Sequence, residues 1–133
     1  MDLPRTPSFR LDGRKALVTG AGRGIGLAAA SALADAGADV CLLARTGSEV
    51  SEAAGAICAR GDAATAMALD VTDTAAMTQL ISEQGPFQVL VNNAGTTRRS
   101  PAHELSLEDW RLVLEINLTA VFALSQAFAK GRI

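Results

Sequence analysis

The sequence predicts an α/β protein with a doubly wound, parallel sheet of about four strands. Short apolar segments alternate with helix-like segments of about a dozen residues, and a glycine-rich turn separates the first pair. Alternation of this kind builds strand–helix–strand units whose right-handed crossovers place helices on both faces of one sheet. The expected order is three strand–helix pairs, then a fourth strand and one long helix, which amounts to half of a full doubly wound fold.

The glycine-rich turn lies in KALVTGAGRGIGL, residues 15–27. Its glycines are Gly20, Gly22, Gly24 and Gly26. Glycine adopts backbone conformations closed to other residues and lets a bulky anion approach the backbone. The N–H groups and positive dipole end of the helix that follows then face that anion. The turn therefore predicts a pyrophosphate site, with a purely structural turn as the alternative on this segment alone.

Local patterns place the other elements. The segment 39–44, DVCLLA, is an apolar run after Asp39, as expected for a strand covered on both faces. Gly85-Pro86 ends a helix. The expected helix-capping residues are Ser48, Asp73 and Ser106, the last within an S-x-x-D start. The expected strands are 15–19, 39–44, 65–69 and 87–91, and the expected helices are 24–36, 48–60, 73–84 and 106–130.

The composition describes one globular domain. With 133 residues, of which 49% are hydrophobic and 20% charged, the chain can bury a core and is too apolar for disorder. We expect a loose leader at 1–12 and one domain at 13–133. The net charge is −2 and the 12 basic side chains form no stripe, which argues against a nucleic-acid partner.

No pattern in the sequence indicates a membrane or a metal. The apolar runs are shorter than a membrane span, and residues 1–15 contain no apolar signal core. Cys41 and Cys58 fall in a predicted strand and a predicted helix, without metal-ligand spacing. We therefore expect reduced cysteines and a cytoplasmic protein.

The spacing of the turn carries a family resemblance. It is T-G-x-x-x-G-x-G, formed by Thr19, Gly20, Gly24 and Gly26, with Gly22, Arg23 and Ile25 between them. It differs from the G-x-G-x-x-G fingerprint and resembles the short, non-extended branch of the short-chain dehydrogenase/reductase family. Three further matches follow in order: Asp70-Val71, Asn92-Asn93-Ala94-Gly95 and Asn117. The resemblance implies a Rossmann-type domain and an oxidoreductase that interconverts a secondary alcohol and a ketone.

The end of the second strand predicts which dinucleotide binds. Leu43-Ala44-Arg45 carries no carboxylate to accept the ribose 2′-hydroxyl of NAD(H). Arg45 and Arg23 instead suit a 2′-phosphate through charge-assisted hydrogen bonds, and basic residues at these positions mark the NADP-preferring members of the family. We predict NADP(H) over NAD(H), with two solvated surface arginines as the alternative.

The resemblance implies a role for each later match. Asp70 would hold the adenine amino group and Val71 would pack on its ring, whereas an Asp after a strand is by itself a turn or helix cap. Ala94 and Gly95 leave room for the ribose and nicotinamide, with Asn92 and Gly95 nearest the cofactor. Asn117 matches an asparagine whose backbone carbonyl holds a water in a proton relay, which makes it the one candidate catalytic residue. A helix-packing hydrogen bond is the alternative for Asn117.

The resemblance stops short of the reaction centre. Family members use a tyrosine as general acid/base, a lysine four residues later, and a serine that orients the substrate, all C-terminal to the position of Asn117. This chain contains no tyrosine. We therefore expect that this chain alone does not catalyse the reaction. It is expected to be a fragment or early-terminated version of a longer enzyme, and that enzyme is expected to form a homodimer or homotetramer.

The resemblance implies the family's strand order, 3-2-1-4-5-6-7, which has a structural consequence for this chain. The fourth strand becomes an edge, although its Val89-Leu90-Val91 suits a buried centre. The last helix is expected to lose cover over Leu112, Val113, Ile116, Val121, Phe122, Leu124 and Phe128. Isolated, the chain is expected to be marginally stable or prone to aggregate.

Two classes of function fit the sequence. One is an NADP-dependent oxidoreductase present as its cofactor half, and the other is a non-catalytic module that binds a dinucleotide or docks onto a partner through its last helix. Thr96-Thr97-Arg98-Arg99 is similar to the gluconate and deoxygluconate dehydrogenase branch, where an arginine suits an acidic sugar, although exposed charge is the alternative. A 3-oxoacyl-carrier-protein reductase fits equally well.

Overall fold

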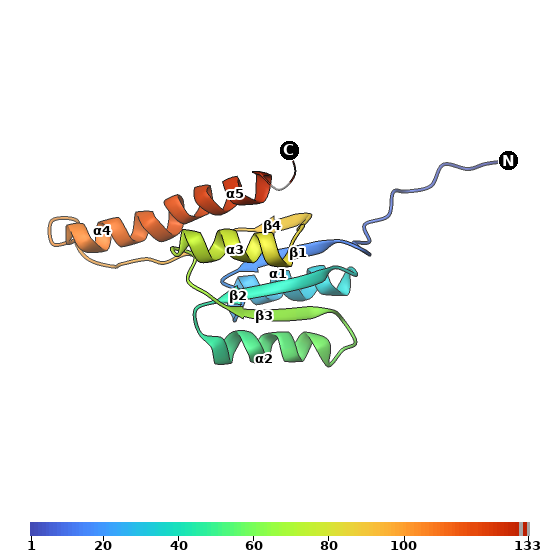
Figure 1. The fold of residues 1–133 in the computed structure, drawn as a ribbon, viewed down its shortest axis with the longest axis horizontal. Helices are drawn as coiled ribbons and strands as arrows, with labels where there is room; N and C mark the ends of the chain where they lie inside the picture. The colour runs from blue at the N-terminus through green and yellow to red at the C-terminus, as the bar shows by residue number, and fades with distance from the viewer. Residues whose placement is uncertain (131, 133) are drawn as a thin grey trace.

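The computed structural model describes residues 1–130 and 132 and contains the predicted parallel sheet (Figure 1). Its strands are β1 (Lys15–Thr19), β2 (Asp39–Ala44), β3 (Ala64–Ala68) and β4 (Val89–Val91), in the order β3-β2-β1-β4. Every neighbouring pair of strands is parallel. Leu17 of β1 pairs with Cys41 of β2 on one side and with Leu90 of β4 on the other. The predicted Rossmann-type α/β fold and its strand order are confirmed, with β4 at an edge of the described sheet.

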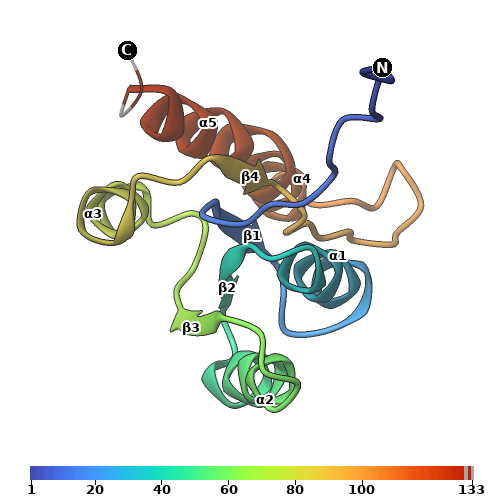
Figure 2. The same cartoon turned by 90° about the vertical axis from the view of Figure 1, so that its right-hand side faces the viewer.

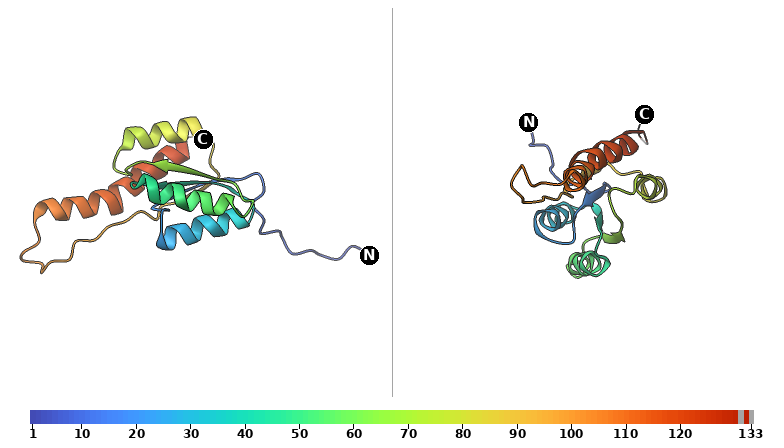
Figure 3. Two further views of the ribbon diagram at one scale, coloured as in Figure 1. Left: turned by 90° about the horizontal axis from the view of Figure 1, so that it is seen from below. Right: turned by 90° about the vertical axis from the view of Figure 1, so that its left-hand side faces the viewer.

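Helices cover both faces of this sheet. They are α1 (Gly24–Asp35), α2 (Gly47–Cys58), α3 (Thr74–Gln84), α4 (Leu107–Leu114) and α5 (Ala120–Lys130), with a π-helical turn, η1 (Glu115–Thr119), between the last two. Viewed along the strands, α1 lies on the opposite side of the sheet from α3 and α5 (Figure 2). Figure 3 shows that α4 projects beyond the sheet.

The core forms two layers because successive strand residues point to opposite faces. Ala16 and Val18 of β1 pack with residues of α1 and α2 in one cluster. Leu17 packs on the other side with Met77 of α3 and Leu124 of α5. Ala16, Leu17 and Val18 are fully buried in the middle of β1, which is why all three are apolar.

Two predicted helix caps are present and one is displaced. The Asp73 carboxylate accepts the N–H of Ala76 at 3.0 Å, and the Ser106 hydroxyl accepts that of Asp109 at 3.1 Å. The second helix begins at Gly47, with Thr46 rather than Ser48 at its N-cap. The prediction of Ser48 was wrong because the chain leaves β2 at Ala44 and needs only Arg45 and Thr46 to reach the helix.

The last helix is interrupted, whereas the sequence predicted it to be continuous. At η1 the N–H of Ala120 bonds to the carbonyl of Glu115, five residues back. Within the helical segment Leu107–Lys130, a window of 18 residues has a mean hydropathy of 1.6, so the segment is long and apolar enough to cross a membrane by length and composition. The expectation that every apolar run is too short is therefore wrong, although Ile116, Ala120 and Leu124 are buried in this fold.

A line of exposed apolar side chains runs along this helical segment, which we call the apolar stripe. Its members are Leu107, Trp110, Leu114, Leu118 and Phe122. Leu118 is 63% exposed and Phe122 is 66% exposed. The predicted loss of cover is correct for Phe122 and wrong for Ile116 and Leu124, because those two residues turn toward the sheet.

The leader extends away from the sheet (Figure 3) until its last residues dock on α1. The N–H of Leu11 donates to the carbonyl of Ala36 at 2.8 Å, and the Arg10 guanidinium donates to that of Asp35 at 3.1 Å. The predicted domain at 13–133 includes Gly131 and Ile133, which lie outside the described residues, and its boundaries stay a prediction.

Candidate functional site

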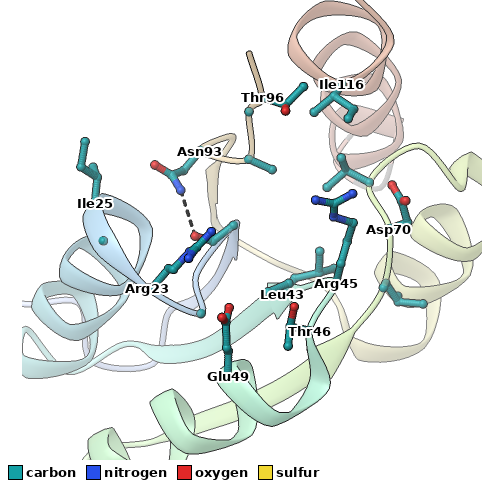
Figure 4. A pocket seen from close by; sticks show the side chains of 18 residues that line it. Arg23, Ile25, Leu43, Arg45, Thr46, Glu49, Asp70, Asn93, Thr96 and Ile116 are labelled. Atoms are coloured by element: carbon teal, nitrogen blue, oxygen red, sulfur yellow. Dashed lines mark hydrogen bonds between the residues drawn. The ribbon is translucent and has the colours of Figure 1, made fainter. Parts of the chain in front are cut away.

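A pocket of about 400 Å³ opens at the carboxyl ends of the strands. Its walls come from the turn after β1, the end of β2, and the loops after β3 and β4 (Figure 4). Ligands of open α/β sheets bind at this edge, in the crevice where the strand order reverses. The predicted residues that line the pocket are Gly20, Gly22, Arg23, Gly24, Ile25, Arg45, Asp70, Val71, Ala94 and Gly95.

The other predicted site residues do not line the pocket. They are Thr19, Gly26, Asn92 and Asn117. Thr19 is 1% exposed, and its hydroxyl accepts the N–H groups of Asn93 at 3.1 Å and Ala94 at 3.0 Å. Thr19 therefore fixes the loop after β4 against the end of β1.

Asn93, in the loop after β4, donates hydrogen bonds back to the glycine turn. Its side-chain amide donates to the carbonyls of Thr19 and Gly20, both at 3.1 Å, and Figure 4 shows the bond to Gly20 as a dashed line. We call these contacts between Thr19, Gly20, Asn93 and Ala94 the turn–loop tie. The tie makes the glycine turn and the loop after β4 one continuous wall.

Two glycines are required where the tie is most crowded. A Cβ on Gly20 would lie 2.9 Å from both the Ala94 Cα and the Asn93 amide nitrogen, and Gly20 has a φ of +63°. A Cβ on Gly26 would overlap the Gly20 carbonyl oxygen and the same amide nitrogen. Gly26 thus allows α1 to approach the turn, while Gly24, at φ +59°, supplies the left-handed backbone that starts the helix.

Side chains of two asparagines hold the last helical segment to the loop after β4. The Asn117 side chain makes two 2.8 Å bonds to the backbone of Thr96, accepting its N–H and donating to its carbonyl. The Asn92 amide donates to the Ser125 hydroxyl at 3.1 Å. A packing hydrogen bond, one of the two interpretations of Asn117, is therefore present in the structure.

Several residues that line the pocket were not among the predicted site residues. They are Leu43, Ala44, Thr46, Glu49, Leu69, Asn93, Thr96 and Ile116. Most directly precede or follow a predicted residue at a strand end, so position along the chain was the available signal. Ile116 comes from η1, which only the three-dimensional arrangement brings to the pocket.

The pocket carries two arginines and two carboxylates. Among residues 1–130 and 132, the side chains of Arg23, Arg45 and Glu49 enter no hydrogen bond or ion pair. Asp70 instead accepts the N–H of Thr72 at 2.9 Å and its hydroxyl at 2.8 Å. The Thr72 N–H lowers the pKa of Asp70, and the charge of Arg45 lowers it further.

The described residues contain no group of side chains suited to hold a metal ion. Both cysteines are free thiols. Burial raises the pKa of the Cys41 thiol to about 11, which removes it from thiolate chemistry near neutral pH.

Comparison with known proteins gives one consistent assignment. The family model described as short chain dehydrogenase matches residues 14–131. The chain is 41% identical over 129 residues to a gluconate 5-dehydrogenase of Gluconobacter oxydans, covering 94% of this chain and 50% of that protein. It is 40% identical over 127 residues to a 3-oxoacyl-acyl-carrier-protein reductase of Vibrio cholerae, covering 92% and 51%.

Solved structures agree with the sequence matches. A gluconate 5-dehydrogenase from Burkholderia cenocepacia, determined with NADP and tartrate, superposes with a TM-score of 0.83 at 39% identity. The match covers 93% of this chain and 50% of that one. The chain thus spans about half the length of the curated relatives it matches.

Gly26→Ala is expected to disrupt the turn–loop tie. The added methyl group overlaps the Gly20 carbonyl and the Asn93 amide, so the free energy of unfolding is expected to fall by about 2–3 kcal/mol. Urea unfolding followed by circular dichroism measures this change. Gly55→Ala is the control because a Cβ there meets no atom within 4 Å, and it is expected to stabilise α2 by about 0.5–1 kcal/mol. Equal stability of Gly26→Ala and the parent would contradict the tie.

Proposed function

We propose that this chain, which belongs to the short-chain dehydrogenase/reductase family, is the cofactor-binding part of an NADP(H)-dependent oxidoreductase. The reaction interconverts a secondary alcohol and a ketone, and bound NADP(H) supplies or accepts the hydride. The observation that carries the proposal is the pocket itself, which brings the glycine turn and both arginines together at the carboxyl edge of the sheet.

The N-terminus of α1 fits a pyrophosphate. Arg23 at the N-cap makes no side-chain capping bond, and the first turn of this 12-residue helix contains no acidic residue. Its first N–H groups therefore have neither a capping oxygen nor a competing carboxylate. Gly20 and Gly24, with positive φ, shape the backbone around the anion.

The region between α1 and β2 fits a ribose 2′-phosphate. The Arg23 and Arg45 side chains both line the pocket without an ion pair in the described part of the chain, so both remain free for a phosphate. Thr46 adds a hydroxyl that caps no N–H of α2. The Burkholderia relative, determined with NADP, supports the same choice of dinucleotide.

The remaining predicted residues form the nucleoside ends of the site. Asp70 and Val71 hold the adenine, while Ala94 and Gly95 leave room for the nicotinamide ribose. The short bonds from Thr72 keep Asp70 ionised and oriented. Asn92 acts indirectly, because its amide bonds to Ser125 of α5.

Asn117 contributes to proton transfer through its backbone carbonyl, which holds a water. Two observations support this role: Asn117 lies inside the π-helical turn, where the backbone bonding pattern shifts by one residue, and its side chain is already committed to Thr96. The chain has no tyrosine to act as the general acid/base, so it binds cofactor and does not catalyse hydride transfer by itself.

A sugar acid is the substrate class we favour, with a 3-oxoacyl thioester as the alternative that the Vibrio relative supports. Arg98 is occupied, because it contacts Asp109 at 3.4 Å and donates to the Thr97 carbonyl at 3.1 Å. Arg99 has no such contact among the described residues. Arg99 is therefore the arginine of this loop that is free to meet a substrate carboxylate.

Arg45→Ala is expected to weaken NADPH binding about tenfold or more and to leave NADH binding nearly unchanged. The lost charge-assisted hydrogen bonds reach only the 2′-phosphate, and bonds to charged groups contribute about 1.5–3 kcal/mol. The change in nicotinamide fluorescence on titration with the 133-residue chain measures both affinities. Arg14→Ala is the control, because Arg14 is exposed and lies outside the pocket. Equal losses for NADPH and NADH would contradict a 2′-phosphate site at Arg45.

The apolar stripe is the surface through which we propose that the protein associates with further copies of itself. Five neighbouring exposed apolar side chains on one helical face exceed what a monomer normally leaves in water. A self-complementary patch of this kind builds a two-fold dimer.

Leu118→Glu is expected to convert a self-associating chain into a monomer, as measured by sedimentation velocity. Burying an unpaired carboxylate at the contact opposes association. Leu3→Glu introduces the same charge at a leader residue that is 72% exposed and is expected to leave the assembly unchanged. If the Leu118→Glu chain associates as the parent does, the apolar stripe is not the surface of self-association.

A further inference from the structure

Glu49 is a pocket carboxylate to which the cofactor site described above assigns no role. It lies in the first turn of α2 and is half-buried. A Cβ built on Gly22 would lie 3.2 Å from the Glu49 Cβ and 3.4 Å from its Oε2. The missing side chain of Gly22 thus lets the Glu49 carboxylate reach the glycine turn, where Figure 4 shows it pointing into the pocket between Arg23 and Thr46.

This carboxylate is uncommitted, unlike the other acidic group of the pocket. Asp70 is held by two hydrogen bonds from Thr72, at 2.9 and 2.8 Å. Within the described residues, no hydrogen bond or ion pair engages the Glu49 side chain. Its negative charge therefore faces the ligand space without a protein partner.

The pocket consequently lacks the net positive charge expected of a site that binds only dinucleotides with a 2′-phosphate. Its charged side chains are Arg23, Arg45, Glu49 and Asp70, two of each sign. A carboxylate repels a phosphate and accepts a hydrogen bond from a ribose hydroxyl. In a sequence, preference for NAD(H) is usually indicated by an acidic residue at the end of the second strand. In this chain the acidic residue, Glu49, comes instead from the first turn of α2.

We propose that Glu49 limits the preference for the 2′-phosphate, so that the pocket accepts both NADP(H) and NAD(H). The inference rests on the proposed function, since it concerns the same dinucleotide site. Arg23, Arg45 and the Thr46 hydroxyl attract the phosphate, while Glu49 opposes it and offers the 2′-hydroxyl of NAD(H) an acceptor.

Glu49→Gln tests this role by removing the charge and keeping the shape of the side chain. The probes are adenosine 2′,5′-bisphosphate and 5′-AMP, which differ only in the 2′-phosphate, titrated into the 133-residue chain by calorimetry. Relative to the dissociation constant for 5′-AMP, the dissociation constant for the bisphosphate is expected to fall about three- to tenfold, because one repelling charge is lost at a partly screened distance. Glu52→Gln removes the same charge from an exposed position on α2 outside the pocket and is expected to change the ratio less than about twofold.

Three other results would contradict the role of Glu49 or the proposed function. If the parent prefers the bisphosphate and Glu49→Gln leaves the ratio unchanged, Glu49 has no role in selection while the proposed function stands. If Glu52→Gln shifts the ratio as much as Glu49→Gln does, the effect is the general charge of α2, and the assignment to Glu49 fails. If the parent binds neither nucleotide, the proposed function fails and this inference fails with it.

Discussion

The turn–loop tie is the contact on which the rest of the site depends. Thr19 accepts two backbone N–H groups from the loop after β4, and Asn93 returns two bonds to the carbonyls that open the glycine turn. These groups lie at the carboxyl ends of β1 and β4 and are partly or fully buried, so a polar atom without a partner would be costly there. Because β1 and β4 are neighbours, the tie joins residues more than seventy positions apart in sequence into one wall.

The last helical segment depends on this wall in turn. Asn117 bonds to the backbone of Thr96 and Asn92 bonds to Ser125, so the first part of the loop after β4 is held to the last helical segment at two points. The π-helical turn lies at this attachment and brings Ile116 to the pocket. One side of the helical segment therefore contributes to the pocket, while the apolar stripe on the same segment remains exposed.

Much of this arrangement could be predicted from the sequence, because local chemistry determines it. The glycines, the apolar run of β2 and the caps at Asp73 and Ser106 are short-range signals, and their order determines the sheet topology. The π-helical turn, the burial of Ile116 and Leu124, and the entry of Glu49 into the pocket depend on packing between distant segments. Thr19 and Gly26 illustrate the difference, since their place in the motif was predicted and their position outside the pocket lining was not.

The central claim is that the glycine turn and the loop after β4 together bind one dinucleotide. The most direct measurement is a titration of the ¹⁵N-labelled chain with NADPH, followed by the backbone amide resonances. We expect saturable shifts that are largest at residues 20–25 and 93–96, the two sides of the pocket. Shifts confined to the apolar stripe, or none at NADPH concentrations that saturate its relatives, would contradict this claim.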